Sequence, residues 1–247
     1  MQAPVGGRRR LRVLCLHSWR TSGAIFREQF ERAKLLPAID DLVELVFIDA
    51  PNAARGPPPK DVAGGFPGRP YYEWFTTEGA EENLSDFVLT YHGLEASEAH
   101  VERVIREAGP FDGLAGFSQG AIMASAMAAM QRAGTALAGA PPLRFVLLFG
   151  AAFSEHPRHQ EAFFKNGRVE VPNVHVIGHK DFIRKHSVNL VRQFANPVVI
   201  FHPRGHVIPH LGGPQLAVLR AFLAAVATEA EGGGGGGAGP PLLASKL

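Results

Sequence analysis

The chain has a single cysteine, Cys15, among its 247 residues. An internal disulfide needs two cysteines, so the sequence excludes one, and a lone thiol suits a reducing compartment. Cys15 lies inside a predicted apolar strand, where a thiol is usually buried and unreactive. We therefore do not assign Cys15 as a nucleophile.

Long apolar segments and a strong charge of one sign are also missing. No stretch approaches the roughly 18 apolar residues that a membrane-spanning helix needs, and no apolar signal-peptide core stands near the start. The net charge is only +2, and the one basic cluster, Arg8-Arg9-Arg10, directly precedes a predicted strand. The sequence therefore predicts no membrane span and no nucleic-acid binding.

Histidine is abundant by contrast, with eleven residues. None of them shows the H-x-x-x-H or H-E-x-x-H spacing that brings two ring nitrogens to one face of a helix. We therefore expect no metal site, and we interpret most of these histidines as packed residues or as neighbours of a catalytic site.

The hydrophobic content of 46% is enough for the core of one domain of ordinary size. Apolar runs alternate with segments of helical periodicity, a pattern typical of a mostly parallel sheet covered by helices. The predicted strands are 11–16, 42–48, 111–115, 143–149, 174–178 and 197–202, and the predicted helices are 26–36, 101–108 (capped by Ser97), 121–130, 187–194 and 216–226. We expect an N-terminal extension at 1–10, a domain at 11–230 and a tail at 231–247.

The most informative motif is Gly116-Phe117-Ser118-Gln119-Gly120. A short apolar stretch precedes it, and a run of strong helix formers without Pro or Gly follows it. This context of strand, sharp turn and helix turns a G-x-S-x-G match into a nucleophile elbow. The small glycines let the helix cross close to the strand, and the helix N-terminus favours the negative charge that develops there. We predict Ser118 as the nucleophile.

A carboxylate and a histidine follow at the ends of two later strands. Asp181 comes just after the predicted strand 174–178, and His206 closes the strand 197–202. Ligands of open α/β sheets bind at the carboxyl ends of the strands, so these groups are placed to meet Ser118. His206 would take the Ser118 proton, and Asp181 would orient the imidazole. The alternatives are a loop aspartate that caps the next helix and a turn histidine.

An acyl-transfer serine enzyme also needs two hydrogen-bond donors for the tetrahedral oxyanion. The backbone N–H of Gln119, the residue after the nucleophile, supplies one. The second is expected from the loop that follows the strand 11–16, and we predict the N–H of Trp19. His17 and Ser18 of the same loop are expected to line the substrate site.

Four segments together resemble the FSH serine hydrolase family: Val13-Leu14-Cys15-Leu16-His17, the block Gly109 to Gly120, Gly178-His179-Lys180-Asp181, and Gly205-His206-Val207-Ile208-Pro209. The resemblance implies an α/β-hydrolase fold, a three-layer α/β/α sandwich. It also implies a Ser118–Asp181–His206 triad and hydrolysis of carboxylic esters or thioesters without a cofactor. Ile208 would lie at the substrate site. The family usually has glycine where this chain has Ser18, so a side chain enters the predicted oxyanion loop. The acyl-protein thioesterases share the Gly-Phe-Ser-Gln-Gly elbow but lack the Gly-His-Val-Ile-Pro segment.

A long connection rich in Pro, Gly and aromatic residues extends from 49 to 95. Connections of this length tend to be lids or binding loops. We expect it to fold over Ser118 and to form an acyl pocket with Phe153, Phe163 and Phe164. Tyr72, Trp74 and Phe75 would be its apolar contacts. The alternative is that these aromatic residues only fix the loop to the core.

The sequence ends in Ser245-Lys246-Leu247, the tripeptide that a peroxisomal import receptor reads. A flexible spacer, Gly232 to Pro241, precedes it and would hold the tripeptide away from the domain. We therefore expect a peroxisomal localisation, with the import receptor as a partner.

Three functions stay open at this point. The first is a serine esterase for short- to medium-chain acyl esters that acts through an acyl-enzyme. The second is a peroxisomal acyl-CoA or other acyl thioesterase, which would need basic residues for the phosphates. The third is a hydrolase-fold binding protein without catalysis. The basic candidates for the second function are Arg55, Lys60, Arg69, Arg184 and Lys185.

Overall fold

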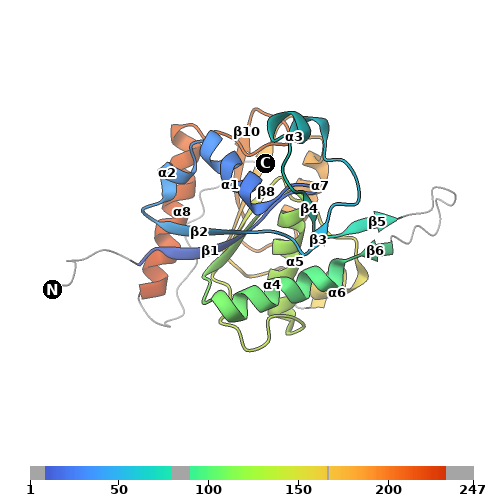
Figure 1. Ribbon diagram of the computed structural model, residues 1–247. Coiled ribbons are helices and arrows are strands. Elements are labelled where there is room, and N and C mark those ends of the chain that lie inside the picture. The colour runs from blue at the N-terminus through green and yellow to red at the C-terminus, as the bar shows by residue number, and fades with distance from the viewer. Residues whose placement is uncertain (1–8, 79–89, 166, 232–247) are drawn as a thin grey trace, which may run out of the picture.

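Six parallel strands form the central sheet of the computed structural model, which describes residues 9–78, 90–165 and 167–231 (Figure 1). Their order across the sheet is β10-β9-β8-β7-β1-β2. Their bounds are β1 Leu11–Leu16, β2 Val43–Ile48, β7 Gly113–Phe117, β8 Phe145–Phe149, β9 Asn173–Gly178 and β10 Val198–His202. After β1 the chain moves first to β2 on one side and then to β7 on the other. Ligands of such sheets bind beside the switch, at the carboxyl ends of the strands.

Helices cover both faces of this sheet (Figure 1). On one face, Phe26 and Phe30 of α1 (Gly23–Arg32) join Phe222 of α8 (Gly213–Glu231) in one apolar core. The other face carries α4 (Leu94–Ala108), α5 (Gln119–Ala133), α6 (Pro157–Lys165) and α7 (Arg184–Val191), whose apolar residues form a second core. The strands β7, β8 and β9 are buried along their whole length. The result is the three-layer α/β/α sandwich expected from the sequence.

The elements differ from the sequence expectations in three places. The predicted helix 26–36 divides into α1 and the short α2 (Leu36–Ile39), because Lys34 takes a left-handed φ of 57°. Ser97 does not cap α4; the helix begins earlier, after Gly93, and Ser97 lies within it. The helix α6 was not predicted, because charged and polar residues interrupt its short apolar face.

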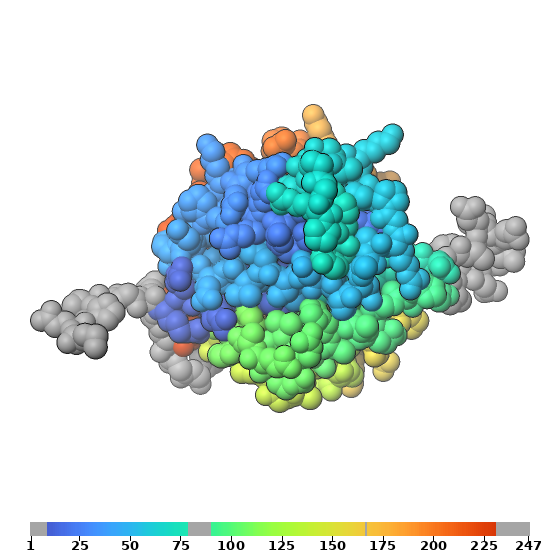
Figure 2. Space-filling view, in the orientation of Figure 1, coloured from blue at the N-terminus to red at the C-terminus, as the bar shows by residue number. Residues whose placement is uncertain are grey.

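The connection 49–95 contains regular structure where the sequence suggested none. It forms β3 (Asn52–Ala53), α3 (Lys60–Gly65), β4 (Tyr72–Glu73), β5 (Thr76–Glu78) and β6 (Thr90–His92). The strands β3 and β4 pair antiparallel, as do β5 and β6. Residues 79–89 of the proposed lid lie outside the described residues, as do the tail from 232 and residues 1–8. Figure 2 shows the α3 segment, in teal, lying at the surface against the blue N-terminal part of the chain.

None of the helices in the described ranges combines the length and the apolar character that crossing a bilayer requires.

Candidate active site

Ser118 occupies a strained turn between β7 and α5. Its backbone has φ 53° and ψ −117°, a left-handed conformation that costs free energy in a residue with a side chain. Hydrogen bonds hold the turn in place: the Ser118 N–H donates to the Phe149 carbonyl oxygen at 2.9 Å, and the Ser118 carbonyl oxygen accepts from Ala121 and Ile122 at 2.9 and 3.0 Å. The strain that the G-x-S-x-G motif predicts is therefore present at this serine.

The surroundings of Gly120 explain why the elbow needs a glycine two residues after the nucleophile. A Cβ atom at this position would lie 2.1 Å from the carbonyl oxygen of Leu16 and 2.4 Å from that of His17. No side chain can be accommodated at these distances without moving the backbone. Gly120 thus lets α5 begin directly against the end of β1, and it brings the elbow next to the loop 17–19.

His206 and Asp181 form a hydrogen-bonded pair at the carboxyl ends of β10 and β9. The His206 Nδ1–H donates to Asp181 Oδ2 at 2.9 Å. The other oxygen, Oδ1, accepts the backbone N–H of Ile183 at 2.9 Å, at the start of α7. Asp181 is therefore the hydrogen-bond partner of a histidine, whereas the alternative of a helix-capping aspartate is not met, because no side chain caps α7, which begins after Ile183.

Close packing positions the imidazole. The His206 ring lies 4.9 Å from the Phe117 ring and 4.8 Å from the Phe182 ring, measured between centroids. At the end of β9, Gly178 lets the loop that carries His206 come near, since a Cβ there would lie 2.5 Å from the Arg204 carbonyl oxygen. The ring is therefore held by two aromatic neighbours and a carboxylate, with Nε2 left for a further partner.

The carboxylate of Asp181 is kept ionised by its partners. Burial alone would raise its pKa, because a charge is less stable away from water. The hydrogen bonds from His206 and from the Ile183 N–H outweigh burial and hold the pKa below its ordinary value. Asp181 is therefore an acceptor for the His206 Nδ1–H throughout the neutral range.

Ser118 and His206 line the same cavity, whose volume is about 490 Å³. Trp19, Ser18 and Ile208 also line it. Its apolar walls come further from Val62 and Phe66 of the α3 segment, and Phe182 stands at its edge with 81% of its surface exposed. The cavity thus joins the elbow, the His206 loop and the α3 segment of the long connection.

The loop after β1 brings the second predicted oxyanion donor to this cavity. Trp19 follows Ser18 in a turn, is 37% exposed, and stacks under the Arg20 guanidinium at 4.2 Å. On the other side, α5 begins at Gln119, and the first N–H groups of a helix have no partner within it. Trp19 therefore lines the cavity of Ser118, whereas Gln119, the residue after Ser118, lines the neighbouring hollow together with Trp19.

His17 does not line the cavity, contrary to the expectation from sequence. The ring is fully buried, with Nδ1 donating to the Ser18 carbonyl oxygen at 2.7 Å and Nε2 accepting the Ala50 N–H at 2.9 Å. Burial lowers the pKa of His17 to about 4, so the imidazole is neutral. His17 is a structural residue that shapes the loop from within.

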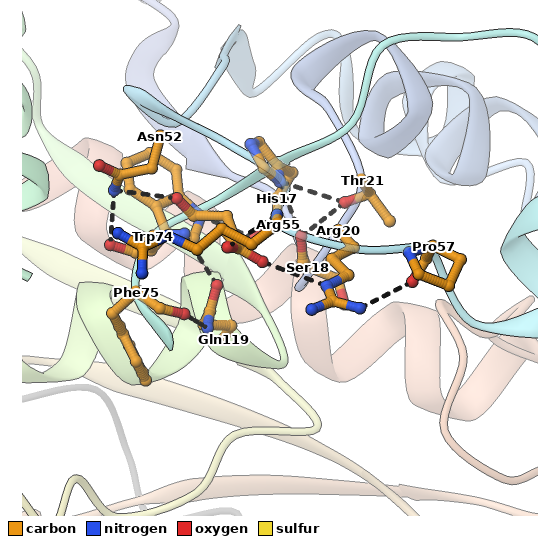
Figure 3. Close-up of polar contacts among 11 residues, drawn as sticks. His17, Ser18, Arg20, Thr21, Asn52, Arg55, Pro57, Trp74, Phe75 and Gln119 are labelled. Atoms are coloured by element: carbon orange, nitrogen blue, oxygen red, sulfur yellow. Dashed lines mark hydrogen bonds and ion pairs between the residues drawn. The ribbon is translucent and has the colours of Figure 1, made fainter. Parts of the chain in front are cut away.

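Trp74 likewise lies inside the protein and not on the cavity wall. Its side chain is fully buried, and its indole N–H donates to the His17 carbonyl oxygen at 2.8 Å. Its backbone N–H donates to the Gln119 side-chain oxygen at 2.8 Å, and the Gln119 amide nitrogen donates to the Phe75 carbonyl oxygen at 2.6 Å. Figure 3 shows Gln119 reaching from the elbow to this pair of residues. Trp74 therefore connects the elbow with the loop after β1.

A buried polar network around Glu73 supports the same segment, and sequence reasoning missed it. Glu73 is paired with Arg20 at 3.2 Å and accepts the Arg55 backbone N–H at 3.1 Å, while Arg20 also donates to the Pro57 carbonyl oxygen (Figure 3). Asn52 donates to the carbonyl oxygens of Glu73 and Trp74, both at 3.1 Å. The only available signal was a charged residue within the aromatic run 71–75.

The other aromatic residues predicted for the acyl pocket lie elsewhere. Tyr72 pairs with Ala53 in the β3–β4 hairpin. Phe75 lines a separate hollow next to Trp19, and Phe153 packs between Phe163 and Phe164, with centroid distances of 5.0 and 5.9 Å. Among the described residues, the long connection contributes to the cavity of Ser118 through Pro59, Asp61, Val62 and Phe66 instead.

Metal-binding and thiol chemistry have no visible support in the described ranges. No group of three His, Cys, Asp or Glu side chains there is arranged to hold a metal ion. Burial raises the pKa of the Cys15 thiol, which is fully enclosed in β1.

Serine, aspartate and histidine follow one another in the order that α/β-hydrolases share, and each leaves the carboxyl end of a parallel strand. The fold and the site together place the chain among the α/β-hydrolases. A solved structure of the same fold, acyl-protein thioesterase 2 from Zea mays, has a TM-score of 0.57 at 19% identity, covering 92% of this chain and 97% of that one.

Sequence comparison narrows the class to a family. The protein-family model described as Serine hydrolase (FSH1) matches residues 7–213, and the chain belongs to this family. Its relatives include esterase OVCA2 of Homo sapiens, 32% identical over 228 residues, which span 89% of this chain and 98% of the human protein. Esterase OVCA2 of Danio rerio is 31% identical, with 81% of this chain and 90% of the fish protein covered.

Proposed function

We propose that the protein is a serine esterase that hydrolyses carboxylic esters of short- to medium-chain acyl groups through Ser118, His206 and Asp181. The observation that carries the proposal is the His206–Asp181 hydrogen bond of 2.9 Å beside a cavity that His206 shares with the strained Ser118. A family of serine hydrolases and relatives named esterases support it. Binding alone would not require a paired imidazole in the same cavity as a half-buried serine in a strained turn.

The chemistry follows from the geometry in two halves. His206 Nε2 takes the Ser118 proton as Oγ attacks the ester carbonyl, and Asp181 stabilises the imidazolium that results. The backbone N–H groups of Gln119 and Trp19 bind the oxyanion. The intermediate collapses to an acyl-enzyme, and the alcohol leaves with the proton from His206. In the second half, His206 takes a proton from a water molecule, the water attacks the acyl-enzyme, and the carboxylic acid is released.

A panel of nitrophenyl esters with increasing acyl length tests this function. We expect wild type to show an optimum in kcat/KM, because the cavity has a limited volume of about 490 Å³. Ser118→Ala should lose activity to the background level, while its melting temperature stays near that of wild type. A folded wild type without turnover on every ester, or a fully active Ser118→Ala, would refute the proposal and favour a binding protein.

We also propose that the protein acts in peroxisomes, on the ground of Ser245-Lys246-Leu247. These residues lie outside the described ranges, so the sequence alone supports this proposal. A fluorescent fusion to the N-terminus should be punctate in cells and become cytosolic when the three residues are deleted. Punctate fluorescence that persists after the deletion would exclude the tripeptide as the address.

A further inference from the structure

Asp181 directly precedes a part of the chain that has no acidic residue, and His206 lies within it. From 182 to 228 the sequence contains no Asp and no Glu, although 23 acidic residues occur in the whole chain. This part forms α7, β10 and most of α8. Elsewhere several exposed arginines of helices form ion pairs with an acid one turn away, as in Arg27–Glu31 and Arg103–Glu107. The helix α7 has no acid with which to form such a pair.

Five cations gather where this part meets the active site: Lys180, Arg184, Lys185, Arg192 and Arg204. We call them the cationic surface. None of the five side chains forms an ion pair with a carboxylate among the described residues, whereas Arg220 in the same part of the chain is paired with Asp41 at 2.7 Å. Like charges at such spacing repel one another, and an anionic ligand relieves the repulsion.

The cationic surface is continuous with the catalytic cavity. The Lys180 N–H donates to the Arg204 carbonyl oxygen at 3.1 Å, and Arg204 itself lines the cavity with Ser118 and His206. Arg184 lies over the Phe201 ring at 5.8 Å and donates its backbone N–H to the Asp181 carbonyl oxygen at 3.1 Å. Phe182 lines the cavity, and Arg184, two residues further along the chain, lines the groove beside α7.

A groove follows the exposed side of α7. It has a volume of about 340 Å³ and is lined by Arg184, Lys185, Val188, Asn189 and Arg192. Guanidinium and ammonium groups are the usual partners of phosphate oxygens, with arginine able to bind two of them at once. The amide of Asn189 and the methyl groups of Val188 add a polar and an apolar contact of the kind that a nucleotide base uses.

We propose that the cationic surface binds the phosphate groups of the substrate's leaving group, so that acyl thioesters of a phosphate-bearing carrier, the chemistry of acyl-CoA, are substrates of this site. The inference rests on the proposed function, because the same Ser118 would be acylated. The acyl chain occupies the cavity between Val62, Phe66 and Ile208. The thiol carrier then extends past Phe182, and its phosphates lie on Arg204, Arg184 and Lys185. In this reaction the C–S bond breaks, His206 protonates the departing thiolate, and water later releases the acid.

Of the other basic residues considered for phosphates, Arg69 is neutralised by Glu28 at 2.7 Å. Arg55 and Lys60 lie on the long connection, and neither lines the groove beside α7. The proposal is therefore restricted to the five residues of the cationic surface.

Paired substrates with the same acyl group test the proposal. For the octanoyl thioester of coenzyme A and the nitrophenyl octanoate, we compare kcat/KM of wild type with that of Arg184→Gln/Lys185→Gln. The ratio of thioester to ester kcat/KM should fall at least ten-fold, mainly through the thioester KM. The matched control is Arg10→Gln/Arg106→Gln, which removes two exposed charges at the amino-terminal edge of the sheet and should leave the ratio unchanged. A ratio within two-fold of wild type in the α7 variant, or an equal fall in the control, would overturn the proposal.

Inhibition experiments distinguish specific binding of coenzyme A from general binding of phosphate compounds. Free coenzyme A should inhibit nitrophenyl ester hydrolysis at concentrations well below those required for ATP or inorganic phosphate, and added salt should weaken this inhibition. Equal inhibition by ATP would mean general binding of polyphosphates and would refute the leaving-group assignment. If wild type hydrolyses neither substrate, the proposed function itself fails; if it hydrolyses only the nitrophenyl ester with dependence on Ser118, only this inference fails.

Discussion

The indole N–H of Trp74 donates a hydrogen bond of 2.8 Å to the carbonyl oxygen of His17, the residue that opens the loop after β1. The rings of the two residues also pack together, with centroids 5.3 Å apart. Because Gln119 holds the backbone of Trp74 at the same time, the two segments predicted to supply oxyanion donors are joined through one buried side chain. Trp74 is therefore placed to position the oxyanion hole without touching the substrate.

Replacing Trp74 by Phe tests this positioning role. The variant keeps an aromatic ring but loses the donor to His17, so the loop that carries Trp19 is less firmly held. We expect kcat to fall by about 10- to 100-fold with little change in KM, because a small misplacement acts mainly on the transition state. The affinity for an alkyl boronic acid, which mimics the tetrahedral intermediate, should fall in parallel.

Tyr71→Phe provides the matched control, since it removes another hydrogen bond of the same segment, from the Tyr71 hydroxyl to the Phe66 carbonyl oxygen. Its kcat should stay close to that of wild type. If Trp74→Phe lowers only the melting temperature, or shifts KM and not kcat, Trp74 has no part in positioning the oxyanion hole.

Asp181→Asn tests the pair that orients the imidazole. The amide can still contact His206, but it cannot stabilise an imidazolium and it favours the wrong tautomer. We expect kcat to fall by about 10³- to 10⁴-fold, by the mechanism known for Ser-His-Asp triads. Steady-state kinetics on the best nitrophenyl ester measure this, with circular dichroism as the check on folding. A loss of less than ten-fold would remove Asp181 from the catalytic machinery.

Buried histidines predict how stability depends on pH. Burial lowers the pKa of His175 to about 3 and that of His17 to about 4, against about 6.5 in an unfolded chain. Between pH about 6.5 and about 4 the unfolded chain binds more protons than the folded one, so the free energy of unfolding decreases as the pH falls. Above pH about 6.5, both histidines are neutral in the folded and the unfolded chain, and the free energy of unfolding no longer depends on their titration.

His175→Phe removes one of these titrations. The ring lies in β9 against Phe194 at a centroid distance of 5.2 Å, and its Nε2 has no hydrogen-bond partner among the described residues. We expect urea unfolding of the variant to show a smaller loss of stability between pH 7 and pH 4.5 than wild type. His186→Gln, at an exposed position of α7, is the control and should retain the wild-type dependence. Identical pH profiles for His175→Phe and wild type would contradict the prediction.

The hydrogen bonds of Asn52 predict that its replacement lowers the free energy of unfolding. Its side-chain NH₂, which has two hydrogens to donate, lies within hydrogen-bond distance of the carbonyl oxygens of Glu73, Trp74 and Gly93 and of the Ser97 hydroxyl. Asn52→Ala leaves these partly buried acceptors with fewer donors, so we expect a loss of about 1–3 kcal/mol in the free energy of unfolding. Asn189→Ala, at an exposed position, should change it by less than about 0.5 kcal/mol. Equal effects of the two substitutions in denaturant titrations would show that Asn52 has no such role.

The sequence predicted the sheet and the elbow because local patterns encode both. The strands β7 and β8 are continuous apolar runs, and β9 is apolar apart from Asn173 and His175. Gly116 and Gly120 flank the nucleophile in a spacing that a tight strand-to-helix turn requires. Asp181 and His206 could be predicted because each follows directly after such a run.

The substrate cavity could not be predicted in the same way, because long-range contacts decide which aromatic residues reach it. Trp74 is drawn into the interior by hydrogen bonds to His17 and Gln119, which lie 57 and 45 residues away. Its place on the wall is taken by Val62 of α3, a helix that no periodicity in the sequence predicted, and by Phe66, which directly follows this helix. The buried pair of Glu73 and Arg20 is equally distant in the sequence, at 53 residues.

The most direct test of the account is labelling with a fluorophosphonate, which reacts with serine nucleophiles that an adjacent base activates. The account predicts that the folded wild type is labelled at one site, which peptide mass spectrometry assigns to Ser118. It also predicts that Ser118→Ala is not labelled and that labelling of His206→Ala is strongly slowed. Labelling at another residue, or none on a folded wild type, would contradict the assignment of Ser118 as the nucleophile.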